Sequence, residues 1–236
     1  MKIDLPCNEE DYKYERKLLV LEIKEISNWR INNMNMTSEQ KNLLATLMNN
    51  KAVLEELMKV ASIQQKQAKD LKMKESITIA GSTWSKFAED SKRNSYMLAD
   101  GTIWNMKFGN NNDWRESLIR KKLNAEFYYN IVAELGQDAL VTIHTDLFSH
   151  DGLRDYGKCE DMISIPTYDL YRNNRENIKC LCQHWWTCTP NSTPLGDNFQ
   201  GVQFVAAGGY VHYRDCSYGG DVRPFIILKS DTFVFV

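Results

Sequence analysis

The residues best equipped for chemistry lie in one short segment near the C-terminus. Side chains of the kind that bind zinc occur within nine residues, at Cys180, Cys182, His184 and Cys188. A zinc knuckle normally has two residues between its cysteines, whereas the Cys-x-Cys spacing places both thiols on the same face of a strand. Small buried thiols that pack beside the neighbouring tryptophans account for the same residues. We therefore expect neither a metal nor another cofactor here.

A catalytic cysteine is the second candidate for chemistry. The thiolate is the reactive form, and a neighbouring base or cation must favour it before a cysteine acts as a nucleophile. No histidine stands beside a cysteine in an arrangement that would do this, and Cys216 lies in a segment of tyrosines and glycines without a close partner. The sequence therefore predicts a protein that is not an enzyme.

Four aspartates raise the question of a calcium site, at Asp146, Asp151, Asp155 and Asp161. Calcium needs several oxygen ligands, and an EF-hand loop supplies them at alternate positions around a central glycine, with a glutamate at its end. The spacing of these aspartates does not follow that pattern. Aspartate also serves commonly in turns and caps, and this is the role that we expect.

A basic cluster lies on one expected helix, at Arg115, Arg120, Lys121 and Lys122. Binding of single-stranded nucleic acid would favour aromatic side chains on an exposed face beside such a cluster. The nearby Trp114 instead has the spacing of a core residue. We therefore expect a solvated face with acidic partners within the chain, and no direct binding of nucleic acid.

Two segments near the C-terminus have the composition of a recognition surface. Tyrosine offers a large contact area with few torsions, and small polar residues form adaptable hydrogen bonds. Ordinary solvated turns also use Gly, Asn and Asp, but we favour a binding role. The candidate ligand-binding residues are Asn191, Asp197, Asn198 and Phe199 in the first loop, and Tyr213, Arg214, Asp215, Tyr218 and Asp221 in the second.

The composition of the whole chain is that of an ordinary globular protein. Its 236 residues are 43% hydrophobic and 25% charged, and 29 basic against 31 acidic residues leave a net charge of −2. This balance favours neither nucleic acid nor an anionic membrane as a partner. No apolar run approaches the roughly 20 residues that span a bilayer, and the first residues lack the apolar core of a signal peptide. We expect a cytoplasmic or virion-associated protein with reduced cysteines.

The first 75 residues form the expected N-terminal region, which reads as helical from residue 8 and contains neither proline nor glycine from there on. A first helix is followed by a polar break at residues 32–36, and a second helix begins near Thr37 and Ser38. Its apolar residues follow a spacing of three and four, which fits either an antiparallel helical hairpin or an intermolecular coiled coil. The candidate partner-binding residues of this helix are Leu47, Asn50, Leu54, Leu57 and Gln64.

Residues 76–236 read as a separate α+β domain, because short strand patterns alternate with helices and long polar loops. Residues 76–80 alternate as a strand does, and Asp100-Gly101 between two apolar runs indicates a tight β-hairpin. Two successive amphipathic helices are expected over residues 114–123 and 124–135, with Gly136 ending the second. Another helix is expected at residues 168–177.

Several blocks of this region resemble a domain of unknown function that is frequent in gut-bacterial genomes and their prophages. Ser117, Ile119, Arg120, Leu123 and Asn124 match its helix motif S-x-I-R-x-x-L-N. The segments at 185–190, beginning with two tryptophans, and at 222–224, Val-Arg-Pro, match its closing motifs. The remaining blocks lie at residues 146–157, 164–172 and 209–211. The resemblance covers residues 77–236.

The closing segment is also similar to the C-type lectin-like fold of formylglycine-generating enzymes and of variable phage receptor-binding proteins. The resemblance implies that residues 185–228 supply the late strands and the ligand-facing loops, and that the two candidate loops fall close together. It further implies a non-enzymatic recognition protein of phage or prophage origin, which binds a protein or glycan and self-associates or docks through its helices. The alternative is an intracellular inhibitor of a bacterial defence system, similar in action to anti-CRISPR proteins.

Overall fold

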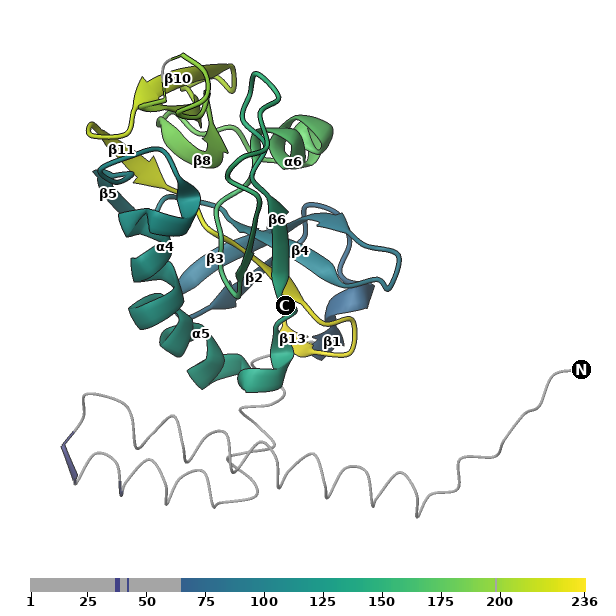
Figure 1. Ribbon diagram of the computed structural model, residues 1–236. Coiled ribbons are helices and arrows are strands. Elements are labelled where there is room, and N and C mark those ends of the chain that lie inside the picture. Colours follow the sequence, from purple (N-terminus) through teal and green to yellow (C-terminus); the bar gives the residue numbers. More distant parts are fainter. Residues whose placement is uncertain (1–36, 39–41, 43–64, 198) are drawn as a thin grey trace, which may run out of the picture. The chain divides into compact units, whose positions relative to one another are not determined.

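The computed structural model describes residues 37–38, 42, 65–197 and 199–236 (Figure 1). The chain divides into two compact units, residues 1–63 and 64–236. Of the expected second helix only Ser38 and Asn42 fall in the described ranges, and both are helical. The choice between a hairpin and a coiled coil, with all five candidate residues of this helix, lies outside the described residues.

The second unit begins earlier than the sequence indicated, because residues 65–75 do not continue an α-helix. Gln65–Gln67 form strand β1, which pairs antiparallel with the last strand β13, Phe233–Phe235. The short 3-10 helix η1, Ala68–Asp70, follows directly. Ala68 and Leu71, which the helical spacing assigned to the N-terminal seam, are instead buried in the core of the second unit. Burial against the tertiary core here overrides the local helical pattern.

Two sheets form the body of this unit, which is an α+β structure dominated by strands (Figure 1). The four-stranded sheet has the order β12-β4-β3-β2, and the five-stranded sheet has the order β10-β9-β8-β11-β5. The first contains Ser76–Ile79 (β2), Ser82–Glu89 (β3), Ser95–Ala99 (β4) and Phe225–Leu228 (β12). The second contains Trp104–Lys107 (β5), Trp185–Pro190 (β8), Gly201–Val205 (β9), Val211–Asp215 (β10) and Gly219–Val222 (β11).

The hairpin expected at Asp100-Gly101 does not form. Strands β4 and β5 flank this dipeptide but belong to different sheets, so the chain crosses from one sheet to the other at this point. The Asp100 carboxylate accepts a hydrogen bond from Ser85 Oγ at 2.5 Å, and its main-chain N–H donates to Thr83 O at 2.8 Å. These contacts hold Asp100 against β3, which is in the first sheet. The Ile103 N–H donates to Val222 O on β11, which is in the second sheet.

The two helices expected over residues 114–135 merge into one continuous helical run over residues 118–135, along one side of the sheets (Figure 1). A 3-10 turn, Trp114–Glu116 (η2), precedes α4, Leu118–Lys122, which Ser117 caps by accepting from Arg120 N–H. A π-helical segment, Leu123–Phe127 (η3), then joins α4 to α5, Tyr128–Leu135, which ends at Gly136 with φ of 90°. The π segment, which has about one more residue per turn than an α-helix, lies where the sequence predicted that one helix ends and the next begins.

The remaining elements connect these parts. A two-stranded ribbon pairs β6 with β7 in antiparallel register, and α6 begins at the Thr167 cap. After β7, Ser164 forms an isolated bridge with Phe225 of β12. Their bounds are Ile143–Asp146 (β6), Lys158–Asp161 (β7), Tyr168–Asn173 (α6), and the 3-10 turns Gln137–Ala139 (η4) and Arg175–Asn177 (η5).

The two adjacent tryptophans of β8 face opposite sides of the five-stranded sheet, as successive residues of a strand do. Trp185 packs in the cluster that contains Tyr171 and Phe225, whereas Trp186 packs in the larger cluster under the helices. Trp186 also donates from Nε1 to Met106 O at 3.1 Å. A Cβ atom at Gly220 would lie 2.5 Å from Trp186 Nε1, so only glycine fits on β11 at this position.

Candidate recognition surface

An aromatic surface lies on β10, on the turn before it and on the turn after it. The side chains of Tyr210, Tyr213 and Tyr218 are 58%, 48% and 64% exposed. They surround a shallow hollow of about 590 Å³. The other residues that line it are Phe204, His212, Arg214, Asp215 and Gly219. Large exposed aromatic side chains are uncommon away from interfaces, so this surface is the strongest candidate for recognition.

Glycines and a buried tyrosine position the turn that carries Tyr210. Gly208 and Gly209 have φ angles of 89° and 85°, which favour residues without a Cβ atom. Tyr171 on α6 donates its hydroxyl proton to Gly209 O at 2.7 Å, and its side chain is buried against Trp185. Helix α6 therefore holds the turn in place from the face of the five-stranded sheet on which Trp185 lies.

Planar side chains pack against one another in a row on the face of β10 that is directed toward the hollow. His212 lies opposite Phe204 in the β9–β10 register, with 6.1 Å between their ring centroids. The Arg214 guanidinium lies 5.1 Å from the centroid of the same Phe204 ring and donates to Gly219 O at 2.9 Å. These contacts limit the rotamers of His212 and Arg214, so a ligand meets a partly ordered surface.

Both signs of charge lie beside the tyrosines. Hydrogen bonds from the Ser217 hydroxyl and N–H lower the pKa of Asp215 below its usual range, so the carboxylate is charged at neutral pH. Arg214 supplies the positive charge. The arrangement can hydrogen-bond a donor and an acceptor while the tyrosine rings cover apolar area, which suits a sugar ring or a polar peptide surface.

The structure brings four of the nine predicted loop residues together at the hollow: Tyr213, Arg214, Asp215 and Tyr218. Three of these four lie in strand β10 and only Tyr218 in a turn, so the expectation of a second loop was wrong for most of its residues. Asp221 lies in β11, where its carboxylate accepts from Asn105 Nδ2 at 2.7 Å.

The first predicted loop does not line this hollow with any of its described residues. The Asn191 side chain accepts from Gln203 Nε2 at 2.8 Å, so it braces β9 within the chain. Asp197 is exposed and Phe199 is 45% exposed, whereas Asn198 lies outside the described residues. Ser192 donates to Asp151 at 2.6 Å, which ties this loop to the segment after β6.

Four residues of the surface were not among those predicted from the sequence: Phe204, Tyr210, His212 and Gly219. Tyr210 and His212 stand directly before the second predicted loop, and the paired glycines ahead of them are a turn signal that could have extended the candidate segment. Phe204 reads as an ordinary core residue of a strand. Only the pairing of β9 with β10 brings it under Arg214.

The aspartates considered for calcium have separate roles. Asp146 pairs with Lys158 at 3.0 Å, Asp155 accepts from Thr193 at 2.7 Å, and Asp161 accepts from Trp114 at 2.8 Å. Asp151 accepts from Ser149 and from Ser192. Within the described ranges, no group of three or more His, Cys, Asp or Glu side chains is arranged to hold a metal ion.

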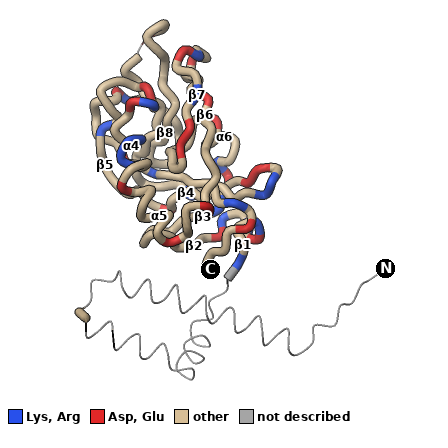
Figure 2. Tube along the Cα trace, turned by 60° about the horizontal axis from the view of Figure 1, so that its bottom comes forward, with Lys and Arg blue, Asp and Glu red and all other residues tan. Residues whose placement is uncertain are grey.

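The basic cluster at the start of the helical run is largely engaged within the chain. Arg115 pairs with Asp113, Arg120 pairs with Asp161, and the Lys122 ammonium lies 4.3 Å from the centroid of the Trp104 ring. The acidic partners expected for this cluster are therefore present for both arginines. Along the described chain, acidic and basic residues are interspersed (Figure 2).

The cysteines divide into buried and exposed groups. Burial raises the pKa of Cys159 to about 12 and also raises those of Cys188 and Cys216, which keeps these thiols protonated. Cys180 and Cys182 are exposed. Since alkylation requires an accessible thiolate, we expect iodoacetamide at pH 8 to modify Cys180 and Cys182 in the folded protein and to modify the buried three only after unfolding. Peptide mass spectrometry measures this, and rapid native labelling of Cys188 would contradict it.

Among the helices that the structure describes, none combines the length and the apolar character needed to cross a membrane. The resemblance of the closing segment to a prophage domain and to lectin-like proteins remains a prediction from its motifs. No family model, no curated protein and no solved structure matches this chain.

Proposed function

We propose that this chain is a non-enzymatic recognition protein, and that it binds a protein or a glycan through the aromatic surface around β10. The observation that carries this proposal is the group of three exposed tyrosines around one hollow, with Arg214 and Asp215 beside them. Tyrosine and arginine are enriched among the residues that dominate binding energy at interfaces. A phage or prophage origin, with the protein in the host cytoplasm or on a virion, belongs to the same proposal.

We further propose a C-type lectin-like arrangement for residues 76–236. Two observations support it. Strands β8 to β12 all fall within residues 185–228, the part to which the resemblance assigns the late strands. The exposed tyrosines lie on β10 and its flanking turns, which come along the chain between β8 and β12, two strands that are buried along their whole length.

A second candidate function is inhibition of a bacterial defence system through protein binding by the N-terminal helices. The division of the chain into two compact units favours keeping this candidate, because residues 1–63 are separate from the unit that carries the aromatic surface. In that case Leu47, Leu54 and Leu57 are the residues expected to contact the target.

The first experiment replaces two of the exposed tyrosines in the full chain. The double variant Tyr213→Ala/Tyr218→Ala should weaken binding to the physiological partner at least about tenfold, because each substitution removes a large exposed contact. Its matched control is Tyr129→Ala on α5, a tyrosine that is 67% exposed and outside the hollow. Glycan arrays and affinity capture from bacterial lysate identify the partner, and calorimetry measures its affinity.

The pattern of loss separates the two functions. Loss in the double variant but not in Tyr129→Ala supports recognition through β10. Loss in Leu54→Glu with full binding by the double variant supports inhibition through the helices and overturns the aromatic surface. The tyrosine variants should unfold at nearly the wild-type temperature, since surface substitutions usually change stability by less than about 0.5 kcal/mol.

A further inference from the structure

A second hollow, of about 700 Å³, lies between β6, α6 and the end strand of the four-stranded sheet. Its floor contains the buried side chains of Phe225 and Ile227 from β12 and the partly exposed Tyr96 from β4. Tyr168 and Leu170 of α6 form one wall. This groove belongs to a different part of the unit from the aromatic surface, since the two share no lining residue.

Strand β6 borders the groove with an edge that no other strand of the described chain pairs with. The Leu147 N–H donates to Gly157 O at 2.9 Å, so these two residues form a hydrogen-bonded pair at the end of the β6–β7 ladder. Hydrogen-bonded and non-hydrogen-bonded pairs alternate along antiparallel strands. The pairs of His144 with Glu160 and of Asp146 with Lys158 are therefore non-hydrogen-bonded. The main-chain N–H and C=O groups of His144 and Asp146 consequently point away from β7.

The groove lies on this free side of β6. It touches all four residues of β6 and none of β7. The groove contacts the buried side chains of Ile143 and Thr145 and also the exposed side chains of His144 and Asp146. Because successive side chains of a strand point to opposite faces, contact with both sets places the groove along the edge of β6. A ladder of unpaired main-chain groups beside an apolar floor is the arrangement to which an extended peptide adds as a further strand.

The charges and the side-chain alternation indicate which peptide fits. Three of the lining residues are aspartates, Asp90, Asp146 and Asp169, whereas one, Arg172, is an arginine. Arg172 pairs with Asp169 and Lys158 pairs with Asp146, but both pairs are exposed and exchange readily with solvent or with a ligand. On an added strand, one set of alternate side chains faces the apolar floor with Ile143, and the other set lies beside His144 and Asp146.

We propose that this groove binds an extended, lysine- or arginine-rich segment of a partner protein, which pairs with the free edge of β6 as an additional strand. Apolar side chains at alternate positions enter the floor formed by Tyr96, Phe225 and Ile227. The cationic side chains between them lie near the aspartates of the rim. The site is separate from the aromatic surface and does not depend on it.

The test uses the full chain and a fluorescent hexapeptide of alternating lysine and valine, with binding measured by anisotropy. The control is the same peptide with N-methyl groups on the alternate amides that would pair with β6. N-methylation removes donors and blocks close approach, so it should weaken binding at least about tenfold. A hexapeptide of alternating glutamate and valine should also bind at least about tenfold more weakly at low salt.

A matched pair of protein variants tests the same edge from the other side. His144→Pro removes the outward N–H without touching the ladder to β7, whereas His144→Ala removes only the side chain. We expect His144→Pro to bind the lysine–valine peptide at least about tenfold more weakly than His144→Ala, because both variants lack the imidazole and only the proline variant also lacks the main-chain N–H.

Several outcomes overturn the proposal. They are equal binding of the N-methylated peptide, equal binding by the two His144 variants, and no binding of the lysine–valine peptide at about 1 mM. Should His144→Pro fail to fold, the comparison of the two peptides on the wild-type protein decides alone. Neither result bears on the tyrosine variants of the aromatic surface, whose hollow shares no residue with this groove.

Discussion

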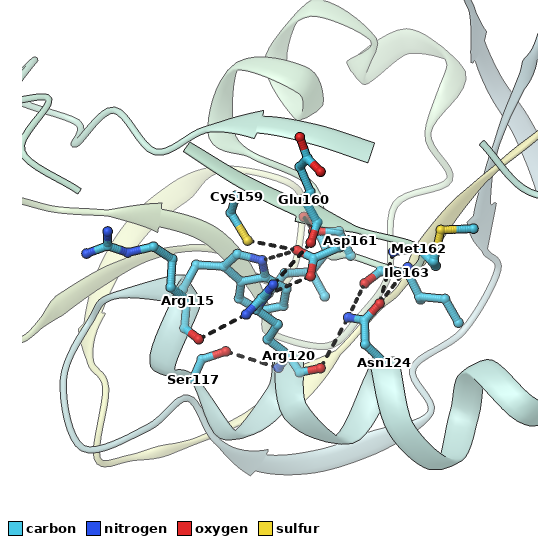
Figure 3. A network of polar contacts seen from close by, with 12 residues as sticks. Arg115, Ser117, Arg120, Asn124, Cys159, Glu160, Asp161, Met162 and Ile163 are labelled. Atoms are coloured by element: carbon cyan, nitrogen blue, oxygen red, sulfur yellow. Dashed lines mark hydrogen bonds and ion pairs between the residues drawn. The ribbon is translucent and has the colours of Figure 1, made fainter. Parts of the chain in front are cut away.

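Replacing Asp161 by alanine is expected to lower the free energy of unfolding by about 3 kcal/mol, because hydrogen bonds to a charged group contribute roughly 1.5–3 kcal/mol and a buried donor left without an acceptor costs about 1–3 kcal/mol. The carboxylate is buried and accepts hydrogen bonds from Arg120 Nε at 2.6 Å, from Trp114 Nε1 at 2.8 Å and from Cys159 Sγ at 3.3 Å (Figure 3). Its removal leaves the Trp114 N–H without its acceptor inside the core and Arg120 without its counterion.

The reason for this large effect is that Asp161 joins two parts of the chain that are far apart in the sequence. It stands at the end of β7, whereas Arg120 in α4 and Trp114 in η2 lie 41 and 47 residues earlier. Asn124 strengthens the same junction, since its side chain bonds the main chain of Met162 and Ile163 (Figure 3). The ribbon that borders the proposed peptide groove is therefore anchored to the helices here.

Urea unfolding monitored by circular dichroism measures the change. Lys158→Ala is the matched control on the same strand, because its ion pair with Asp146 is exposed and should contribute less than about 1 kcal/mol. Asp161→Asn should have an intermediate cost, since it keeps the acceptor for Trp114 but not the charge for Arg120. A loss for Asp161→Ala no larger than that of Lys158→Ala would show that the network does not stabilise the fold.

Replacing Arg223 by alanine is the second substitution with a large expected effect, about 3 kcal/mol or more of lost stability. The side chain is 1% exposed, and burial lowers its pKa to about 10. Its guanidinium donates to Ala99 O at 2.7 Å and to Lys179 O at 2.9 Å, and it lies 5.3 Å from the centroid of the Trp185 ring. Hydrogen bonds from charged donors contribute roughly 1.5–3 kcal/mol each.

The geometry of the guanidinium predicts that lysine does not rescue the variant. A single ammonium on a flexible chain cannot reach two carbonyl groups in the fixed directions that the planar guanidinium serves. We expect Arg223→Lys to recover less than half of the loss in thermal and urea unfolding. Arg214→Lys, at a partly exposed position, should be nearly neutral. Full recovery of stability with Arg223→Lys would contradict the role of the paired carbonyl contacts.

Parts of the fold were predictable because local patterns carried them. The alternation at residues 76–80 became β2, the Gly136 stop ended α5, and a helix, α6, begins at Tyr168 as expected. Arg223, in the closing Val-Arg-Pro motif, is held by its two carbonyl contacts. In each case the deciding interaction is either local in sequence or made by a buried charge with few alternatives.

Other parts depended on contacts between distant residues. The hairpin signal at Asp100-Gly101 was overridden because Ser85 and Thr83 on β3 hold Asp100 and because β5 pairs with β11 instead. Residues 65–71 continue a helical spacing, yet they pair with the C-terminal strand and enter the core. A turn propensity contributes less free energy than a full ladder of strand pairs, so the ladder decides.

By itself, the sequence determined the α+β class, the burial of the two tryptophans and the neighbourhood of the aromatic surface, because composition and short-range alternation report burial and local geometry. Only the tertiary structure decided which residues share a site. Pairing of β9 with β10 places His212 opposite Phe204 and brings Arg214 over the same ring, and the groove is lined by residues from position 90 to position 227. Strand pairing and contacts between distant residues decide these sites, and neither leaves a signal in local spacing.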